Sequence, residues 1–358
     1  MIYSILQLIN FILTYIGISY SQYLPPYGAL FQRLIVDTIG ALLIFIAASL
    51  TIVVVIYIFR KWMADLQQRI GPNRVGPYGT LQLIADALKM FGKEDIIPDN
   101  VDPILFRFAP YLVFIPLIMS YLLIPYGTIY HWAIIFTNVN VTLLLIIAFS
   151  AIPPIGEIIA GFASNNKFSL IGALRAAAQD LSYEIPMMIS LIGVIMLTGS
   201  LNLNTISQYQ WHYIPIAILE PIGFLVFFVA VLSKMAVVPF DLPESESELV
   251  SGFNVEYSGL RFGIFYLGVF GSIFFGSLFI STVYLGGGSD LPFLPGFGYV
   301  WLLIKAFIFT FLFLTIWVSL PRIRVDKYMN FGWKYLLPLS LINLLWTMVL
   351  ILFMQGVL

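Results

Sequence analysis

A short acidic stretch, Pro239–Gly259, carries the side chains best suited to proton chemistry. Its sequence, PFDLPESESELVSGFNVEYSG, lies between two long apolar runs and contains five carboxylates: Asp241, Glu244, Glu246, Glu248 and Glu256. Crowded carboxylates repel one another unless cations, partner subunits or bound protons compensate them. The stretch therefore predicts either a solvated loop, which charge runs usually form, or a surface for docking and proton handling.

Ionisable residues also occur inside the apolar runs. An ionisable group at membrane depth is costly and by default indicates an ion path. Some have a plainer interpretation: Asp180 can pair with Arg175, and Lys305 can extend toward the outer end of its run, whereas Glu184 has no such alternative. This group consists of Glu157, Asp180, Glu184, Lys234 and Lys305.

Two adjacent prolines, Pro153 and Pro154, interrupt one apolar run just before Glu157. Proline removes a backbone donor and clashes with the preceding turn, so we expect a kink or break. Broken backbone at membrane depth is tolerated where it is buried in protein or lines water. The pattern is equally consistent with a water-containing interior beside Glu157 and with a proline-kinked helix that only packs against its neighbours.

Composition places the chain in a membrane. Of its 358 residues, 60% are hydrophobic and 10% are charged, whereas soluble domains are about 45–50% apolar. Apolar runs recur that reach the roughly 20 residues a helix needs to cross hydrocarbon. We therefore predict an all-α, polytopic membrane protein.

The chain offers little to hold a redox centre. It has no cysteine and only two histidines, His131 and His212, both in expected loops. We expect no metal site, haem or iron–sulfur cluster on this chain. Nucleotide-binding and hydrolase fingerprints are missing as well, and we expect no nucleic-acid partner. A redox cofactor would then be a diffusible ligand or belong to a partner chain.

About eight spans are expected from the apolar runs. They are Val36–Phe59, Ile104–Ile124, Trp132–Gly161, Gly172–Thr198, Ile214–Val237, Gly259–Leu285, Val300–Leu320 and Trp333–Phe353. Residues 34–358 form the expected membrane domain. Residues 1–33 form an apolar extension, either an extra span or an interfacial helix. Because Ile2–Ile18 lacks a basic n-region and a small-residue cleavage signature, we do not interpret it as a cleaved signal peptide.

Charge differs between alternate loops. Lysine and arginine follow the first, third and seventh expected spans, while Pro125–His131, Gly199–Tyr213 and Gly286–Gly298 contain neither. Positive loops remain on the cytoplasmic or matrix side. We therefore expect the basic and acidic loops on that side of a prokaryotic cell membrane or mitochondrial inner membrane.

The first basic loop contains a turn cluster and an amphipathic segment. Gly71–Pro77 is rich in residues that fix or reverse the backbone. After it, Leu81, Ile84, Leu88 and Phe91 recur at helical spacing. We expect a helix on the membrane surface, either an anchor or one wall of an entrance for an amphiphile.

Motifs along the chain resemble one known family. They are Gln68–Pro77 (QRIGPNRVGP), Ala85–Lys89 (ADALK), Lys93–Asp95 (KED), Ser164–Leu170 (SNNKFSL), Ser182–Glu184 (SYE), Pro239–Glu244 (PFDLPE), Glu256–Ser258 (EYS) and Leu320–Asp326 (LPRIRVD). In this order they resemble membrane subunit 1, the H subunit in bacteria, of respiratory complex I, the proton-translocating NADH:quinone oxidoreductase. The resemblance runs from about Val36 to the C-terminus.

The resemblance implies a quinone substrate and other complex I subunits as partners, namely peripheral-arm iron–sulfur and hydrogenase-like subunits and small membrane subunits. Arg69, Arg74, Asp86 and Lys89 would line or support the quinone entrance. Glu184, Glu244, Glu246 and Glu248 match positions credited with proton coupling. The remaining ionisable groups complete the predicted coupling set: Glu157, Asp180, Lys234, Asp241, Glu256 and Lys305.

The chain is a divergent member in this comparison. Phe59 and Lys234 stand where the family usually has Glu, Val237 and Trp317 where it usually has Arg, and Val269 where Glu is common. Three other interpretations remain open. They are the equivalent subunit of a membrane-bound hydrogenase or a ferredoxin- or deazaflavin-dependent relative, a stand-alone secondary ion transporter, and a structural membrane anchor.

Overall fold

The structure is a computed structural model that describes residues 26–129, 132–133, 139–212, 214–289 and 297–354. The N-terminal segment Ile2–Ile18 and His131 lie outside the described residues. Whether residues 1–33 form a separate extension therefore stays a prediction. The first described helix begins at Pro26, within that range.

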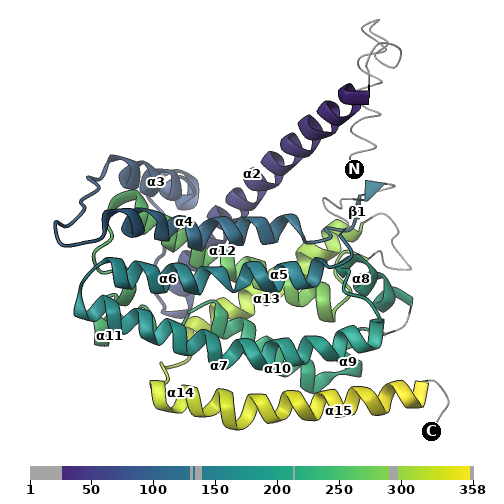
Figure 1. Cartoon of the computed structure of the whole chain (residues 1–358). Coiled ribbons are helices and arrows are strands. Elements are labelled where there is room, and N and C mark those ends of the chain that lie inside the picture. Colours follow the sequence, from purple (N-terminus) through teal and green to yellow (C-terminus); the bar gives the residue numbers. More distant parts are fainter. Residues whose placement is uncertain (1–25, 130–131, 134–138, 213, 290–296, 355–358) are drawn as a thin grey trace, which may run out of the picture.

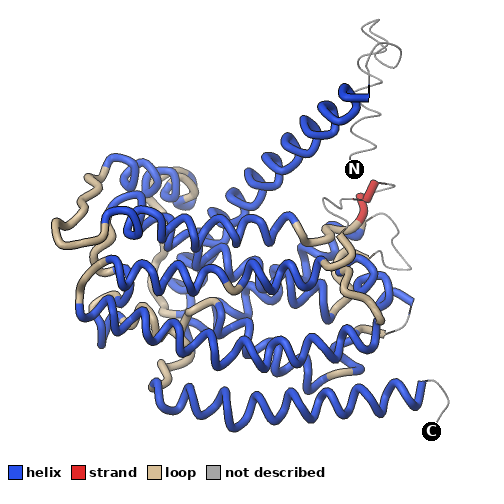
Figure 2. Tube along the Cα trace, viewed as in Figure 1, coloured by secondary structure: helices blue, strands red, loops and turns tan. Residues whose placement is uncertain are grey.

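The described chain is almost entirely helical, which confirms the predicted fold class (Figure 2). One antiparallel pair of two-residue strands, β1 (Thr128–Ile129) and β2 (Trp132–Ala133), interrupts it. The helices are α2 (Pro26–Leu66), α3 (Gln82–Gly92), α4 (Pro103–Leu122), α5 (Thr142–Ser150), α6 (Ile152–Ala163), α7 (Lys167–Thr198), α8 (Leu203–His212), α9 (Ile216–Leu219), α10 (Pro221–Lys234), α11 (Glu246–Leu249), α12 (Gly259–Tyr284), α13 (Gly298–Ser319), α14 (Val325–Phe331) and α15 (Leu337–Met354).

Seven helical segments in the described part of the chain are long and apolar enough to cross a membrane. Six of them begin or end within a few residues of expected spans, and the α5–α6 pair begins at Thr142 instead of Trp132. The remaining expected span, Ile214–Val237, is represented by the 14-residue α10. The protein is thus a multi-pass membrane protein.

Prolines divide two of the expected spans. α5 ends at Ser150 and α6 begins at Ile152, with Pro153 in its first turn, which confirms the predicted break. α9 and α10 are separated at Glu220, directly before Pro221. The residue before a proline is disfavoured in the helical region, and Glu220 has φ −123° and ψ 66°. This break was not predicted.

α12 lies at the centre of the bundle. Of its apolar window, 67% is buried inside the protein, against 22–50% for the other six spans. α2, α4, α10 and α13 pack around it, while α7 packs against α6, α10 and α15. α2 extends beyond the bundle at its N-terminal end, and α15 lies along the opposite face (Figure 1).

The connecting segments gather at two ends. Figure 1 shows α3, α11 and α14 at one end, and β1, α8 and α9 at the other. We call these the acidic-loop end and the distal end. All the loops expected on the positive side of the membrane meet at the acidic-loop end. Which side of the membrane that end faces stays a prediction.

The acidic loop folds against the bundle through a close backbone approach at Gly252. Gly252 has φ +59°, and a Cβ there would lie 1.6 Å from the Pro243 carbonyl oxygen. Gly172 of α7 faces the same turn, since a Cβ there would lie 2.7 Å from the Phe253 nitrogen. The loop therefore has a defined path that depends on small residues.

Gly252→Ala should destabilise the protein, because it adds both a backbone strain of about 1–3 kcal/mol and a steric clash. Gly92→Ala is the matched control, since a Cβ there meets nothing within 4 Å. Thermal unfolding of the purified protein should show a lower Tm for the first variant only. Equal Tm values for both variants would contradict this account of the loop.

Candidate functional site

A largely but not fully buried charge cluster lies where α5, α7 and α10 meet. The Lys234 ammonium is 3.1 Å from Glu184 Oε1 and 3.5 Å from Asp180 Oδ1. It also donates to the carbonyl oxygen of Ser150, at 3.0 Å, and to the hydroxyl oxygen, at 3.2 Å. Three of the residues predicted for proton coupling are thus brought into direct contact.

The local sequence explains why the cluster forms here. Asp180 and Glu184 are four residues apart on α7, so they share one face of the helix. The Ser150 carbonyl would normally accept from the N–H of the residue four positions later, which is Pro154 and has none. The proline break thus leaves a carbonyl acceptor that the Lys234 ammonium uses.

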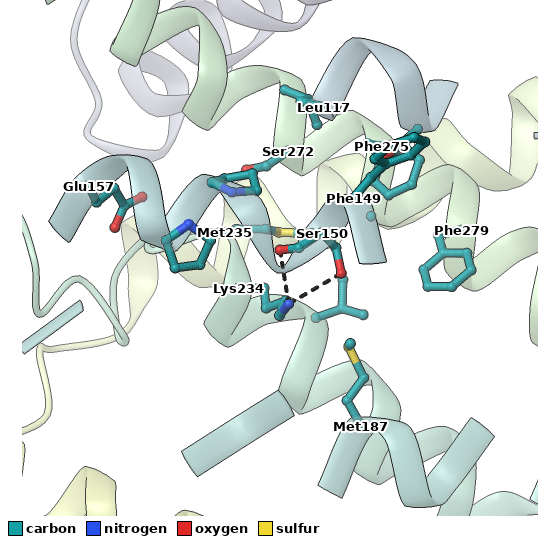
Figure 3. A pocket seen from close by; sticks show the side chains of 15 residues that line it. Leu117, Phe149, Ser150, Glu157, Met187, Lys234, Met235, Ser272, Phe275 and Phe279 are labelled. Atoms are coloured by element: carbon teal, nitrogen blue, oxygen red, sulfur yellow. Dashed lines mark hydrogen bonds between the residues drawn. The ribbon is translucent and has the colours of Figure 1, made fainter. Parts of the chain in front are cut away.

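Two neighbouring cavities adjoin the cluster. One, of about 90 Å³, is lined by Ser150, Glu157 and Lys234 together with apolar side chains. Figure 3 shows Glu157 on one side of this cavity and the Lys234–Ser150 contacts on the other. The second, of about 50 Å³, shares Glu157 and Lys234 and extends to Phe253 of the acidic loop. Cavities of this size whose largely apolar walls carry a few polar groups, here Glu157 and Lys234, have room for water molecules.

Two arginines bind carboxylates of the acidic loop. Arg175 of α7 is 2.6 Å from Glu248 Oε2. Arg322 is 3.2 Å from Asp241 Oδ2 and donates from Nε to the Asp241 carbonyl oxygen at 3.0 Å. The hydrogen bond from Arg175 holds the pKa of Glu248 below its usual range, so this carboxylate is ionised at neutral pH.

Amides hold two further carboxylates. Asn166 Nδ2 donates to Glu256 Oε1 at 2.7 Å, and Asn254 Nδ2 donates to Glu244 Oε1 at 3.2 Å. Glu246 begins α11, and its side chain lies outside the described part of the structure. The crowding of the loop is therefore compensated largely by groups of this chain itself.

The residues predicted at the entrance surround α3. Asp86 accepts hydrogen bonds from Arg60 of α2 and from Gln82. Arg69 donates to Gln67 Oε1 at 2.8 Å, and Arg74 and Lys89 are exposed. The amphipathic helix is confirmed: large exposed apolar side chains follow one side of it, namely Leu81, Ile84, Leu88 and Phe91.

Lys305 lies away from the other predicted residues. Its ammonium donates to the carbonyl oxygens of Leu285, at 2.6 Å, and Gly287, at 3.1 Å. These carbonyls follow the C-terminus of α12, where a cation satisfies unpaired acceptors. The structure therefore gives Lys305 a helix-capping contact at the distal end.

The unusual residues of this chain also cluster. Phe59 stacks on Trp317 with ring centroids 4.3 Å apart, and Phe270 packs against both rings. Phe59 and Trp317 stand where the family that this sequence resembles usually has Glu and Arg. An aromatic stack thus occupies two positions that usually carry opposite charges. At two further unusual positions the substitutions differ in kind. Lys234 is a cation at the end of α10, and Val237, three residues later, is a buried apolar residue.

Sequence reasoning missed several participants. Arg60, Ser150 and Asn254 were not predicted at the site, and neither was Glu220, which is fully buried. The sequence did contain a signal for the Ser150 carbonyl acceptor, because Pro154, four residues later, has no N–H to donate to it. Glu220 was detectable as a carboxylate inside the expected span Ile214–Val237.

Comparison with known proteins identifies the family of this chain. The family model described as NADH dehydrogenase matches residues 39–348. The chain belongs to the NADH dehydrogenase family, that of complex I subunit 1. It is 42% identical over 299 residues to the H subunit of the NADH-quinone oxidoreductase of Dehalococcoides mccartyi (strain CBDB1), covering 83% of this chain and 82% of that protein. The resemblance seen in the sequence is thereby confirmed.

Replacing the central cation of this family member tests the charge cluster. Lys234→Met leaves Asp180 and Glu184 facing each other, and breaking a buried ion pair costs about 3–5 kcal/mol. The groups are 14–18% exposed, so we expect a loss toward the lower end of that range. Thermal unfolding should show a reduced Tm.

A second variant separates charge from packing. Glu184→Gln in the Lys234→Met background removes one of the two uncompensated carboxylates and should recover part of the lost stability. A double-mutant cycle measures the recovery. Strictly additive losses would show that the ion pair is not the stabilising interaction.

Proposed function

We propose that this chain is the membrane-arm subunit of a complex I-type NADH:quinone oxidoreductase that admits quinone and couples its reduction to proton translocation. Family membership and the likeness to the Dehalococcoides mccartyi relative, an NADH-quinone oxidoreductase component, support the enzyme class. The chain would act as part of a larger translocase, with quinone as a diffusible substrate.

One observation carries the coupling proposal: α7 joins the acidic loop to the buried cluster. Arg175 of α7 binds Glu248 of the loop, and Asp180 and Glu184 of the same helix bind Lys234. Reduction of a quinone draws protons and changes the local charge. Clustered carboxylates respond to such a change through their pKa values.

The entrance is proposed at α3. Its apolar side is exposed to the bilayer, and the Arg60–Asp86 ion pair fixes it against α2. Arg69, Arg74 and Lys89 add positive charge beside it. A lipid-soluble quinone would then leave the bilayer between α2 and α3 and pass the Arg60–Asp86 ion pair on its way inward.

The quinone chamber is proposed to be shared with partner subunits. The cavities beside Glu157 are sized for water, whereas a substituted quinone ring needs more room. A peripheral-arm subunit seated on the acidic loop would complete the chamber. Such subunits, iron–sulfur and hydrogenase-like, would also supply the electrons, since this chain has no cysteine.

The acidic-loop end is proposed to face the cytoplasm, or the matrix in a mitochondrion. The lysines and arginines of the connecting segments gather at this end, and loops rich in these residues are retained on that side. The distal end would then face outward.

Glu248→Gln and Glu246→Gln should each lower quinone reductase activity of the assembled complex more than they lower its abundance. Loss of the Glu248 charge frees Arg175, so we expect roughly a tenfold effect, equivalent to about 1.4 kcal/mol. Asp99→Asn, at an exposed position outside the loop, is the control. Unchanged turnover in both glutamate variants would remove the loop from the mechanism.

Ala85→Trp should raise the apparent KM for quinone, because it places a bulky ring on the half-buried side of α3. Ala87→Trp, on the exposed side of the same helix, controls for general effects of the ring. Steady-state kinetics with a soluble quinone analogue measure both. If only assembly suffers, the entrance does not lie at α3.

A further inference from the structure

A second carboxyl site lies near the distal end, separate from the Lys234 cluster. It consists of Glu220, Asn343, Thr347 and Tyr284, which we call the distal carboxyl site. Glu220 precedes α10, whereas Lys234 ends it. Fourteen residues of helix at a rise of 1.5 Å each separate the Cα positions of Glu220 and Lys234 by about 21 Å along the helix axis.

Glu220 is fully buried, with 0% exposure. Its Oε2 accepts from Asn343 Nδ2 at 3.1 Å, and Asn343 Oδ1 accepts from the Gly223 N–H at 2.8 Å. Oε1 has no hydrogen-bond partner within the described residues. A buried carboxyl oxygen without a protein partner is an unusual feature that calls for an explanation.

The site can hold the carboxyl group in either protonation state. The Asn343 amide and the N-terminus of the 14-residue α10 both favour the anion. The apolar surroundings favour the neutral acid, and Phe224 and Phe227 pack edge-on or tilted against the Tyr284 ring. Because the amide and the helix N-terminus oppose the effect of the apolar surroundings, the Glu220 carboxyl group is able to gain and lose a proton.

The distal carboxyl site is closely packed, and glycines leave the room that Glu220 and Asn343 occupy. A Cβ at Gly193 would lie 2.7 Å from Glu220 Oε2, and one at Gly223 would lie 2.6 Å from Asn343 Nδ2. The Thr347 hydroxyl lies beside the same carboxyl group and donates to the Asn343 carbonyl oxygen at 2.7 Å. Four elements, α7, α10, α12 and α15, thus surround one carboxyl group.

A purely structural role explains these contacts less well. Glutamine would keep the hydrogen bond to Asn343 without placing an ionisable group in the membrane, where such a group is costly. One buried hydroxyl, that of Ser190, lies on α7 between Glu184 and Gly193 and donates to the Met187 carbonyl oxygen at 2.7 Å.

We propose that Glu220 is a proton-binding site whose occupancy changes during turnover. The carboxylate takes up one proton, forming an O–H bond and becoming the neutral acid, and later releases the same proton by breaking that bond, with no electron transfer. The inference rests on the proposed function, because turnover is that of the assembled quinone reductase. Asn343 and Thr347 position the carboxyl group.

The test is infrared difference spectroscopy on the assembled complex, comparing oxidised and quinol-reduced states. A Glu220 that changes protonation produces a difference band in the carbonyl-stretch region of protonated carboxyl groups. Glu220→Gln should remove that band and lower the number of protons translocated per quinone reduced. Thr347→Val, which keeps the carboxyl group but alters its surroundings, should shift the band without removing it.

The outcomes separate this inference from the proposed function. If Glu220→Gln and Thr347→Val leave all carboxyl bands and the proton yield unchanged, Glu220 is structural and the inference fails. If Glu220→Gln does not assemble, an unshifted spectrum in Thr347→Val also overturns it. Loss of the proposed function itself would appear as a wild-type complex that does not reduce quinone.

Discussion

A single cation held between two carboxylates is the interaction on which this structure depends. Lys234 must be paired because an isolated charge inside an apolar bundle is strongly unfavourable. Its partners come from α7, and its remaining donors are used by the Ser150 carbonyl that the proline break exposes. This one ammonium group thereby links α5, α7 and α10.

The acidic loop extends the same principle to the surface. Its carboxylates are held by Arg175, Arg322 and two asparagine amides, so the loop is fixed to the bundle at several points. Because Arg175 and the Lys234 ligands lie on one helix, a change of charge at the loop can alter the cluster without a large movement. The stack of Phe59 on Trp317 leaves the neighbouring region apolar, so this family member concentrates its charge along α7.

Much of the fold was predictable because long apolar runs and proline positions act locally. The seven spans, the surface helix at α3 and the break before α6 all depend on residues close together in sequence. The pairings of Lys234 and Arg60 were not predictable, since they join helices far apart in the chain. Lys305 lies within a span, as expected, but its contact with the carbonyl oxygen after α12 joins two helices across a loop and was not predictable. Glu220 was overlooked because the apolar run around it suggested one continuous span.

Photolabelling of the assembled complex with a reactive quinone analogue tests the central claim most directly. The account predicts adducts on this chain at the acidic-loop end, within Arg60–Lys93 or Pro239–Gly259, and competition by unlabelled quinone. Adducts confined to partner subunits, or on this chain only around the distal cavity of about 290 Å³ lined by Tyr126 and Tyr299, would contradict it.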